Sequence, residues 1–164
     1  MGYGFKAIAS YSSAFNVPPL GYLYYNNPYW AANPFLKPES AHSVQAALQW
    51  SGSPVVVRAT LFQTTGSNMW GFGATPNGLT QFQNIARTRT RGLELSGRGN
   101  WRRWSYDVNV TVQHPVALSE PGHPTLQRMA THMANVSIDY DFGRVTTGLL
   151  AHYSGPRPDV AYSP

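Results

Sequence analysis

Apolar and polar residues alternate strictly along residues 103–113, "RWSYDVNVTVQ". The apolar positions are Trp104, Tyr106, Val108, Val110 and Val112, and the polar positions are Ser105, Asp107, Asn109, Thr111 and Gln113. A period of two predicts a β-strand with one apolar and one polar face. In a soluble β-sandwich the apolar face would pack on a core, whereas in a membrane β-barrel it would face lipid and the polar face would line the lumen.

The same alternation recurs along the chain and predicts seven strands, while no window shows a helical stripe with caps. The predicted strands cover residues 3–14, 42–51, 54–66, 82–97, 101–113, 131–142 and 144–154. One apolar set is expected to form a continuous outward band: Val44, Ala46, Leu48, Val55, Val57, Leu93, Leu95, Val108, Val110, Val136, Ile138 and Leu149.

The lengths of the connections distinguish the two all-β architectures. The short connections are "SGS", "GRGN" and "DFG", and the long ones are residues 15–41, 67–81, 114–130 and 155 onward. Strict alternation of short and long connections places all short turns on one side of a membrane, whereas a sandwich has no reason to sort its loops. We therefore predict an all-β, antiparallel up-and-down transmembrane β-barrel with short periplasmic turns and long extracellular loops. Bacterial barrels close with an even number of strands, so about seven strands are expected to form an incomplete arc.

Composition agrees with a membrane barrel, because only 12% of the residues are charged while 13% are aromatic. Cysteine is absent, which excludes disulfides, thiolate metal sites and a cysteine nucleophile. No N-terminal signal is recognisable, and no apolar run reaches the ~18 residues of a membrane helix. Arg87, Arg89 and Arg91 alternate along one predicted strand and share one face near its end, without the aromatic platforms of a nucleic-acid surface. No nucleic-acid partner is expected.

Residues 33–50, "NPFLKPESAHSVQAALQW", resemble the Asn-Pro-x-Leu-Lys-Pro-Glu segment of TonB-dependent outer-membrane receptors. The preceding "YSSAFNVPPLGYLYY" and the later "NIARTRTRGLELSGRGNWRRWSYDVNVTVQ" are similar to that family's strand-to-loop passage and its Asn…Arg-x-x-Gly-x-Glu strand, in the expected order. The resemblance implies a bacterial outer-membrane protein that is not an enzyme. It also implies a 22-stranded barrel with an N-terminal plug and nutrient uptake driven by the TonB complex. Residues 1–164 are then expected to be a fragment of the barrel domain that lacks the plug, through which TonB acts, and the last strands.

Within this family, the chain resembles cobalamin (vitamin B12) receptors, in which an Arg and a Tyr of neighbouring extracellular loops contact the corrinoid. The corresponding residues are Arg128 in "TLQRMA" and Tyr162 in "GPRPDVAY", although Met129 stands where the family often has a second Arg. Cobalamin or a related corrinoid is therefore the first expected ligand, and a ferric siderophore is the alternative. A solvated loop Arg and a membrane-interface Tyr are the structural alternative for these two residues. A passive porin or a secreted β-sandwich binding module is the alternative from another class.

Five aromatic residues cluster in the first long connection: Tyr22, Tyr24, Tyr25, Tyr29 and Trp30. Their rings would stack on a large conjugated ligand, or belong to the aromatic girdle at the membrane interface, and the sequence leaves both open.

Charged and metal-ligating residues complete the candidate chemistry. Arg58, Arg91 and Glu94 are expected to line the lumen and to pair with each other or with the plug. The histidines and methionines show no ligand spacing, and no nucleophile–base–acid set stands out. We therefore expect no metal, no cofactor and no catalytic residue.

Overall fold

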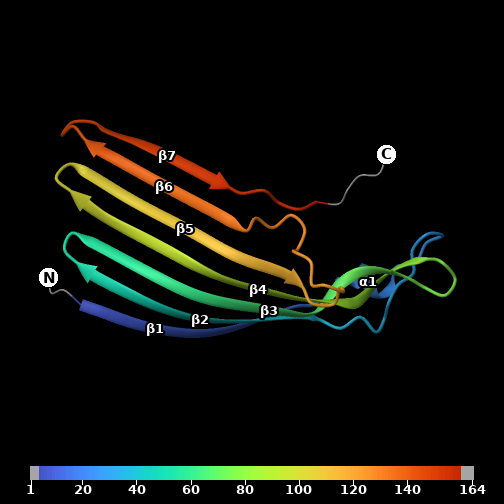
Figure 1. Cartoon of the computed structure of the whole chain (residues 1–164). Helices are drawn as coiled ribbons and strands as arrows, with labels where there is room; N and C mark the ends of the chain where they lie inside the picture. Colours follow the sequence, from blue (N-terminus) through green and yellow to red (C-terminus); the bar gives the residue numbers. More distant parts are fainter. Residues whose placement is uncertain (1–3, 160–164) are drawn as a thin grey trace.

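The chain forms one antiparallel sheet in which every strand pairs with its neighbour in sequence (Figure 1). The computed structural model describes residues 4–159. Its elements are β1 (Gly4–Asn16), α1 (Leu20–Tyr24), β2 (Glu39–Gly52), β3 (Val55–Ala74), β4 (Thr80–Trp101), β5 (Trp104–Ala117), β6 (His132–Asp141) and β7 (Thr146–Ser154). The seven predicted strands and their up-and-down antiparallel order are confirmed. Within residues 4–159 there is no second sheet, so the sandwich alternative is wrong.

Strand register aligns residues of one character across the whole sheet. One apolar row crosses all seven strands and consists of Ala7, Leu48, Ala59, Leu95, Val110, Ala134 and Tyr153. The adjacent row points to the other face and consists of Lys6, Gln49, Arg58, Ser96, Asn109, Asn135 and His152. Because successive side chains of a strand alternate between faces, the sheet has one apolar face and one polar face.

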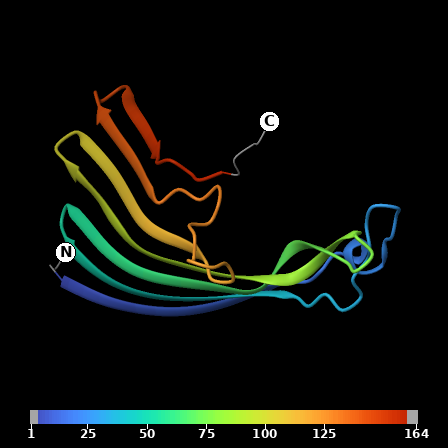
Figure 2. The ribbon, with the colours of Figure 1, turned by 45° about the vertical axis from the view of Figure 1, so that its right-hand side comes forward.

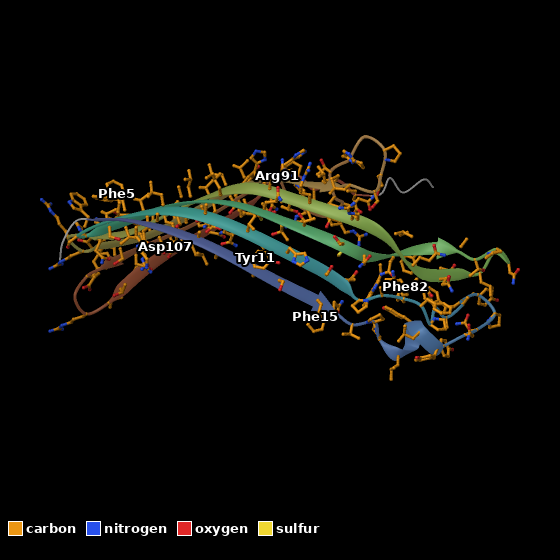
Figure 3. All side chains as sticks on the ribbon, turned by 90° about the horizontal axis from the view of Figure 1, so that it is seen from below. Phe5, Tyr11, Phe15, Phe82, Arg91 and Asp107 are labelled. Atoms are coloured by element: carbon orange, nitrogen blue, oxygen red, sulfur yellow. The ribbon has the colours of Figure 1, made fainter. Side chains whose placement is uncertain are left out.

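Within residues 4–159, no other layer covers the apolar face. Large apolar side chains on it remain accessible, for example Leu48 at 53%, Val110 at 38% and Leu149 at 67%. The sheet is bent along and across its strands (Figure 2). Phe5 and Arg91 lie on one side of it and Asp107 on the other (Figure 3). The predicted outward set therefore lies on one face, as expected for a wall that faces lipid.

Burial is concentrated where loops fold over the ends of strands. Val116 and Ala130 are almost fully buried, because the segment after β5 folds back along it through hydrogen bonds such as Leu126 N to Pro115 O (3.0 Å). Leu36 is buried in the connection between β1 and β2. Among residues 4–159, the other buried side chains include Ala47 and Thr60, which pair across β2 and β3 in the sheet itself.

Aromatic rings gather at the opposite end, beside the short turns. The Trp104 and Tyr140 ring centroids are 4.6 Å apart, and Tyr140 lies 4.6 Å from Phe142. The Arg102 guanidinium lies 5.1 Å from the Trp101 ring centroid. Amphipathic rings at the edge of an apolar band are the usual pattern of a membrane interface.

The predicted turn at residues 97–100, "GRGN", is wrong. Strand β4 continues to Trp101, which pairs with Trp104, and the turn is formed by Arg102 and Arg103 with Arg102 at φ 55°. Gly99 lies within the strand, where an added Cβ would be 2.7 Å from the Tyr106 hydroxyl and 2.8 Å from the Pro54 carbonyl oxygen. This glycine provides space for Tyr106 and does not form a turn.

Residues 67–81 do not form the long loop that the sequence predicted. Strands β3 and β4 extend through this region and are joined by residues 75–79, with a bulge near Met69. Cross-strand packing keeps the extension paired, as in the contact of Phe72 with Phe82 at 4.8 Å between centroids. The connection between β1 and β2 also holds the helix α1, which the sequence did not predict. Within residues 4–159, no helix is long and apolar enough to cross a membrane.

Arg91 does not lie on the polar face, contrary to the sequence prediction. It pairs with Gln63 in β3 and His114 in β5, and its side chain lies on the same face as Leu93 and Leu95 of β4. Its Nε donates to Gln63 Oε1 at 2.5 Å. Side chains alternate between faces along β4, and the even-numbered positions such as Glu94 lie on the polar face. The odd-numbered Arg91 therefore lies on the apolar face.

The two faces of β5 give a direct test of the wall. Val110→Arg is expected to destabilise the intact barrel in lipid by about 2–4 kcal/mol, because it places a charge in the middle of the apolar face. Asn109→Arg is the matched control on the polar face, where the new side chain can donate to Glu94 Oε1 as Asn109 Nδ2 does at 2.8 Å. Unfolding in lipid measures both, and equal losses would contradict the assignment of faces.

Candidate functional site

The connection between β1 and β2 is fastened to the extended β3–β4 hairpin (Figure 1). Main-chain bonds join Ala31 N to Thr80 O at 2.9 Å and Thr80 N to Tyr29 O at 3.1 Å. Asn33 Nδ2 donates to Phe82 O at 2.9 Å, and Asn84 bonds Lys37 through both its amide nitrogen and its oxygen. The connection is therefore held in place along its length.

An aromatic cluster forms the contact between this connection and the hairpin. Tyr22 and Phe82 have ring centroids 4.0 Å apart, and Trp30 lies 4.9 Å from Phe82 and 6.0 Å from Phe72. The edge of Trp70 meets Tyr22 at 6.0 Å, and the Trp70 Nε1 donates to Lys37 O. Trp70, Phe72 and Phe82 were missed as site residues, although Trp70 and Phe72 show the same period of two as the strand before them.

The five aromatic residues expected to act together have different roles. Tyr22 and Trp30 are partly buried in the cluster, whereas Tyr24, Tyr25 and Tyr29 are 66%, 60% and 83% exposed. Gly21, Tyr25 and Asn27 line an open groove together with Trp30, Phe72 and Phe82. The connection thus presents exposed, flat, amphipathic rings on a supported base, which suits a large conjugated ligand.

Arg128 lies in the connection between β5 and β6 and contacts the segment after β7. Its backbone NH donates to Pro158 O at 2.8 Å, and its Nε lies 3.2 Å from Asp159 Oδ1. Both side chains are exposed, so the ion pair contributes little to stability. Tyr162 lies outside the described residues. The Arg128–Pro158 contact nevertheless joins the two connections that the sequence analysis assigned to one rim.

The polar face carries Arg58 and Glu94, but within residues 4–159 they do not form an ion pair with each other. Glu94 accepts a hydrogen bond from Asn109, while the Arg58 Nε is buried without a partner. Arg58 lines a recess with Gln49, Ser96, Arg98 and Asp107. Pairing of these charges with a plug remains a prediction. Among the described residues, no group of three or more His, Asp or Glu side chains is arranged to hold a metal ion.

A single antiparallel wall with one exposed apolar face, tight turns at one end and elaborated connections at the other defines a transmembrane β-barrel protein. The family model "TonB dependent receptor-like, beta-barrel" matches residues 3–163. The chain therefore belongs to the TonB-dependent receptor β-barrel family, whose members are transporters and not enzymes, and it resides in the bacterial outer membrane. Membership of this family excludes the passive-porin alternative.

Solved structures of this architecture resemble the chain in fold. The copper transporter OprC matches with a TM-score of 0.67 and 20% identity over 90% of this chain and 23% of its own. The ferric-catecholate import receptor Fiu from E. coli K12 matches with a TM-score of 0.68 and 20% identity over 92% of this chain and 22% of its own. The FrpB iron transporter from Neisseria meningitidis gives 0.61, with 12% identity over 93% and 24%. The chain thus spans about a quarter of the length of these proteins.

Removing the Trp30 ring should loosen the connection without damaging the wall. Trp30→Ala removes contacts with three aromatic rings, each worth about 0.5–1.5 kcal/mol beyond burial, so local opening should become easier by roughly 1.5–4.5 kcal/mol. Hydrogen exchange at the Ala31 and Thr80 amides in the intact receptor measures this.

Tyr29→Ala is the control for this change, because the Tyr29 ring is exposed and only its backbone holds the connection. In the Tyr29→Ala variant, hydrogen exchange at the Ala31 and Thr80 amides should stay near that of the parent protein. Equal exchange in both variants would mean that the aromatic cluster does not support the connection.

Proposed function

We propose that the chain is part of the wall of a receptor that imports a large, scarce, conjugated metal chelate across the outer membrane. The first candidate ligand is cobalamin or a related corrinoid, and the second is a ferric siderophore. The observation that carries this proposal is the group of exposed rings, Tyr24, Tyr25 and Tyr29, on a connection that Trp30 and the β3–β4 hairpin hold in place.

The proposed receptor has more strands than this chain and contains a plug that TonB acts upon. Strands β1 and β7 each have one neighbour in the sheet, and an unpaired strand edge in lipid costs several kcal/mol per backbone group. The match to about a quarter of each related structure supports a larger closed barrel. In such a barrel, Arg58 and Arg98, which share the polar face, would be available to acidic groups of the plug.

Two groups of residues are proposed to bind the ligand. Tyr24, Tyr25, Tyr29 and Trp30 would provide apolar stacking surface from the first long connection. Arg128 and Tyr162 would approach from the connections after β5 and β7, with Arg128 donating to an amide carbonyl or phosphate of a corrinoid. The Asp159 carboxylate holds Arg128 at 3.2 Å and would release it as the ligand binds.

The two ligand classes have different support. The corrinoid rests on the resemblance around Arg128 and Tyr162. The ferric siderophore is supported by likeness to a ferric-catecholate import receptor and an iron transporter, both similar to this chain in fold. Both ligands offer a flat conjugated surface to exposed tyrosines, so the tyrosines alone do not choose between them.

The proposal is tested with the purified full-length receptor and two probes, cyanocobalamin and a ferric tris-catecholate. Tyr25→Ala and Arg128→Ala should each weaken binding of the true ligand by roughly ten- to a hundredfold, as expected for anchor residues, while the barrel folds normally. Titration by intrinsic fluorescence gives the dissociation constants. Arg144→Ala, in the short turn before β7, removes the same charge at the opposite end of the wall and should change nothing.

Each outcome has a defined meaning. Tight binding of cyanocobalamin that both substitutions weaken supports a corrinoid receptor. Tight binding of the catecholate instead would reject the corrinoid and retain the second ligand. Binding of neither probe, or affinities that no substitution changes, would contradict the proposed site.

A further inference from the structure

Basic side chains lie on the apolar face directly beyond its band of aliphatic residues. The last aliphatic row in this direction contains Ala46, Leu61, Leu93 and Val112. The next row on the same face contains Val44, Gln63, Arg91 and His114, and the following one contains His42, Thr65, Arg89 and Val116. Beyond the Ala46–Val112 row, the face therefore changes from purely aliphatic to rows in which basic, polar and apolar side chains are mixed.

The position of these arginines along β4 corresponds to the outer boundary of the membrane's apolar layer. Arg91 lies ten residues before Trp101, which closes the short turn at the other end of β4. At ~3.3 Å per residue and a tilt of about 40°, this spacing corresponds to roughly 25 Å along the membrane normal. An outer-membrane barrel has an apolar band of about this height, so Arg91 and Arg89 are at the level of the headgroups of the outer leaflet.

These arginines lack acidic partners. The one ion pair within residues 4–159 joins Arg128 and Asp159, far along the chain. The Arg91 Nε is bound to Gln63, the Arg89 Nε is buried without a hydrogen bond, and Arg87 is exposed two residues further along β4. Glu94, the carboxylate nearest in sequence, is on the opposite face. The positive charge on the lipid-facing side is thus not neutralised by the protein.

We propose that Arg89 and Arg91 bind the phosphate groups of a phosphorylated glycolipid in the outer leaflet. Guanidinium groups form charge-assisted, paired hydrogen bonds with phosphate oxygens, and basic residues beside a bilayer bind anionic headgroups in the same way. The aliphatic row below them, including Leu93 and Val112, contacts the acyl chains of the same lipid. Arg87 extends the basic surface toward solvent. The site is independent of the ligand that the receptor imports.

The double variant R89Q/R91Q tests this site in the full-length receptor. Binding of lipid A in nanodiscs of otherwise zwitterionic lipid should weaken by about 10- to 30-fold, as native mass spectrometry of the lipid-bound receptor can measure. Lipid A without its phosphates should bind the parent and the variant equally. R89K/R91K retains both charges and should keep most of the affinity.

R102Q/R103Q is the matched control, because it removes the same charge from a short turn at the other end of the wall. Its lipid A affinity should equal that of the parent, and heat-dependent gel migration should show that all variants are folded. The proposal is overturned by an unchanged affinity in R89Q/R91Q, by an equal loss in R102Q/R103Q, or by equal binding of phosphorylated and dephosphorylated lipid A. Competition by millimolar inorganic phosphate as strong as that by lipid A would likewise reject a lipid site.

Discussion

The whole structure depends on the register of the antiparallel backbone hydrogen bonds. In a bilayer the backbone groups must be satisfied within the protein, and a ladder of paired strands does this only when each strand keeps its neighbour. Because side chains alternate with a period of two, a slip of one residue would exchange the faces of a strand. Arg58 and Glu94 would then enter lipid, and Val57 and Leu95 would enter the polar interior. The contrast between the two faces therefore fixes the register as strongly as the turns do.

The same ladder also supports the extracellular surface. Strands β3 and β4 do not stop where the apolar band ends but continue as a hairpin, and the connection that contains α1 packs on it. The rings of Tyr22, Trp30 and Phe82 fill the contact, so the exposed tyrosines rest on an element that is continuous with the wall. Residues for binding are thus placed on a loop, but their position is determined by strand geometry.

Sequence periodicity predicted most of the fold, because a sheet with one apolar and one polar face requires a regular alternation of apolar and polar residues. Every strand showed alternation, and the apolar set from Val44 to Leu149 lies on one face as predicted. Periodicity failed where residues have reasons other than burial. Gly99 suggested a turn but accommodates Tyr106, and Gly71 and Gly73 obscured the strand character of the β3 extension. The pairing of Trp30 with Phe82 joins residues distant in sequence, and no local pattern could reveal it. The placement of Arg91 on the apolar face, by contrast, could have been predicted, because Arg91, Leu93 and Leu95 are two residues apart along one strand.

Arginine has distinct physical roles in different places on this wall. On the polar face, Arg58 shares a recess with Arg98, the Asp107 carboxylate and the polar side chains of Gln49 and Ser96. At the short turns, Arg102 lies over the Trp101 ring and extends from the aromatic edge of the band. At the other end, Arg89 and Arg91 stand on the apolar face itself, where an uncompensated charge is costly unless an anion approaches from the lipid side. The chain has few charged residues, and the place of each one depends on whether its side chain meets lipid, headgroups or water. The excess of positive charge therefore follows from the two boundaries of the membrane and needs no nucleic-acid partner to explain it.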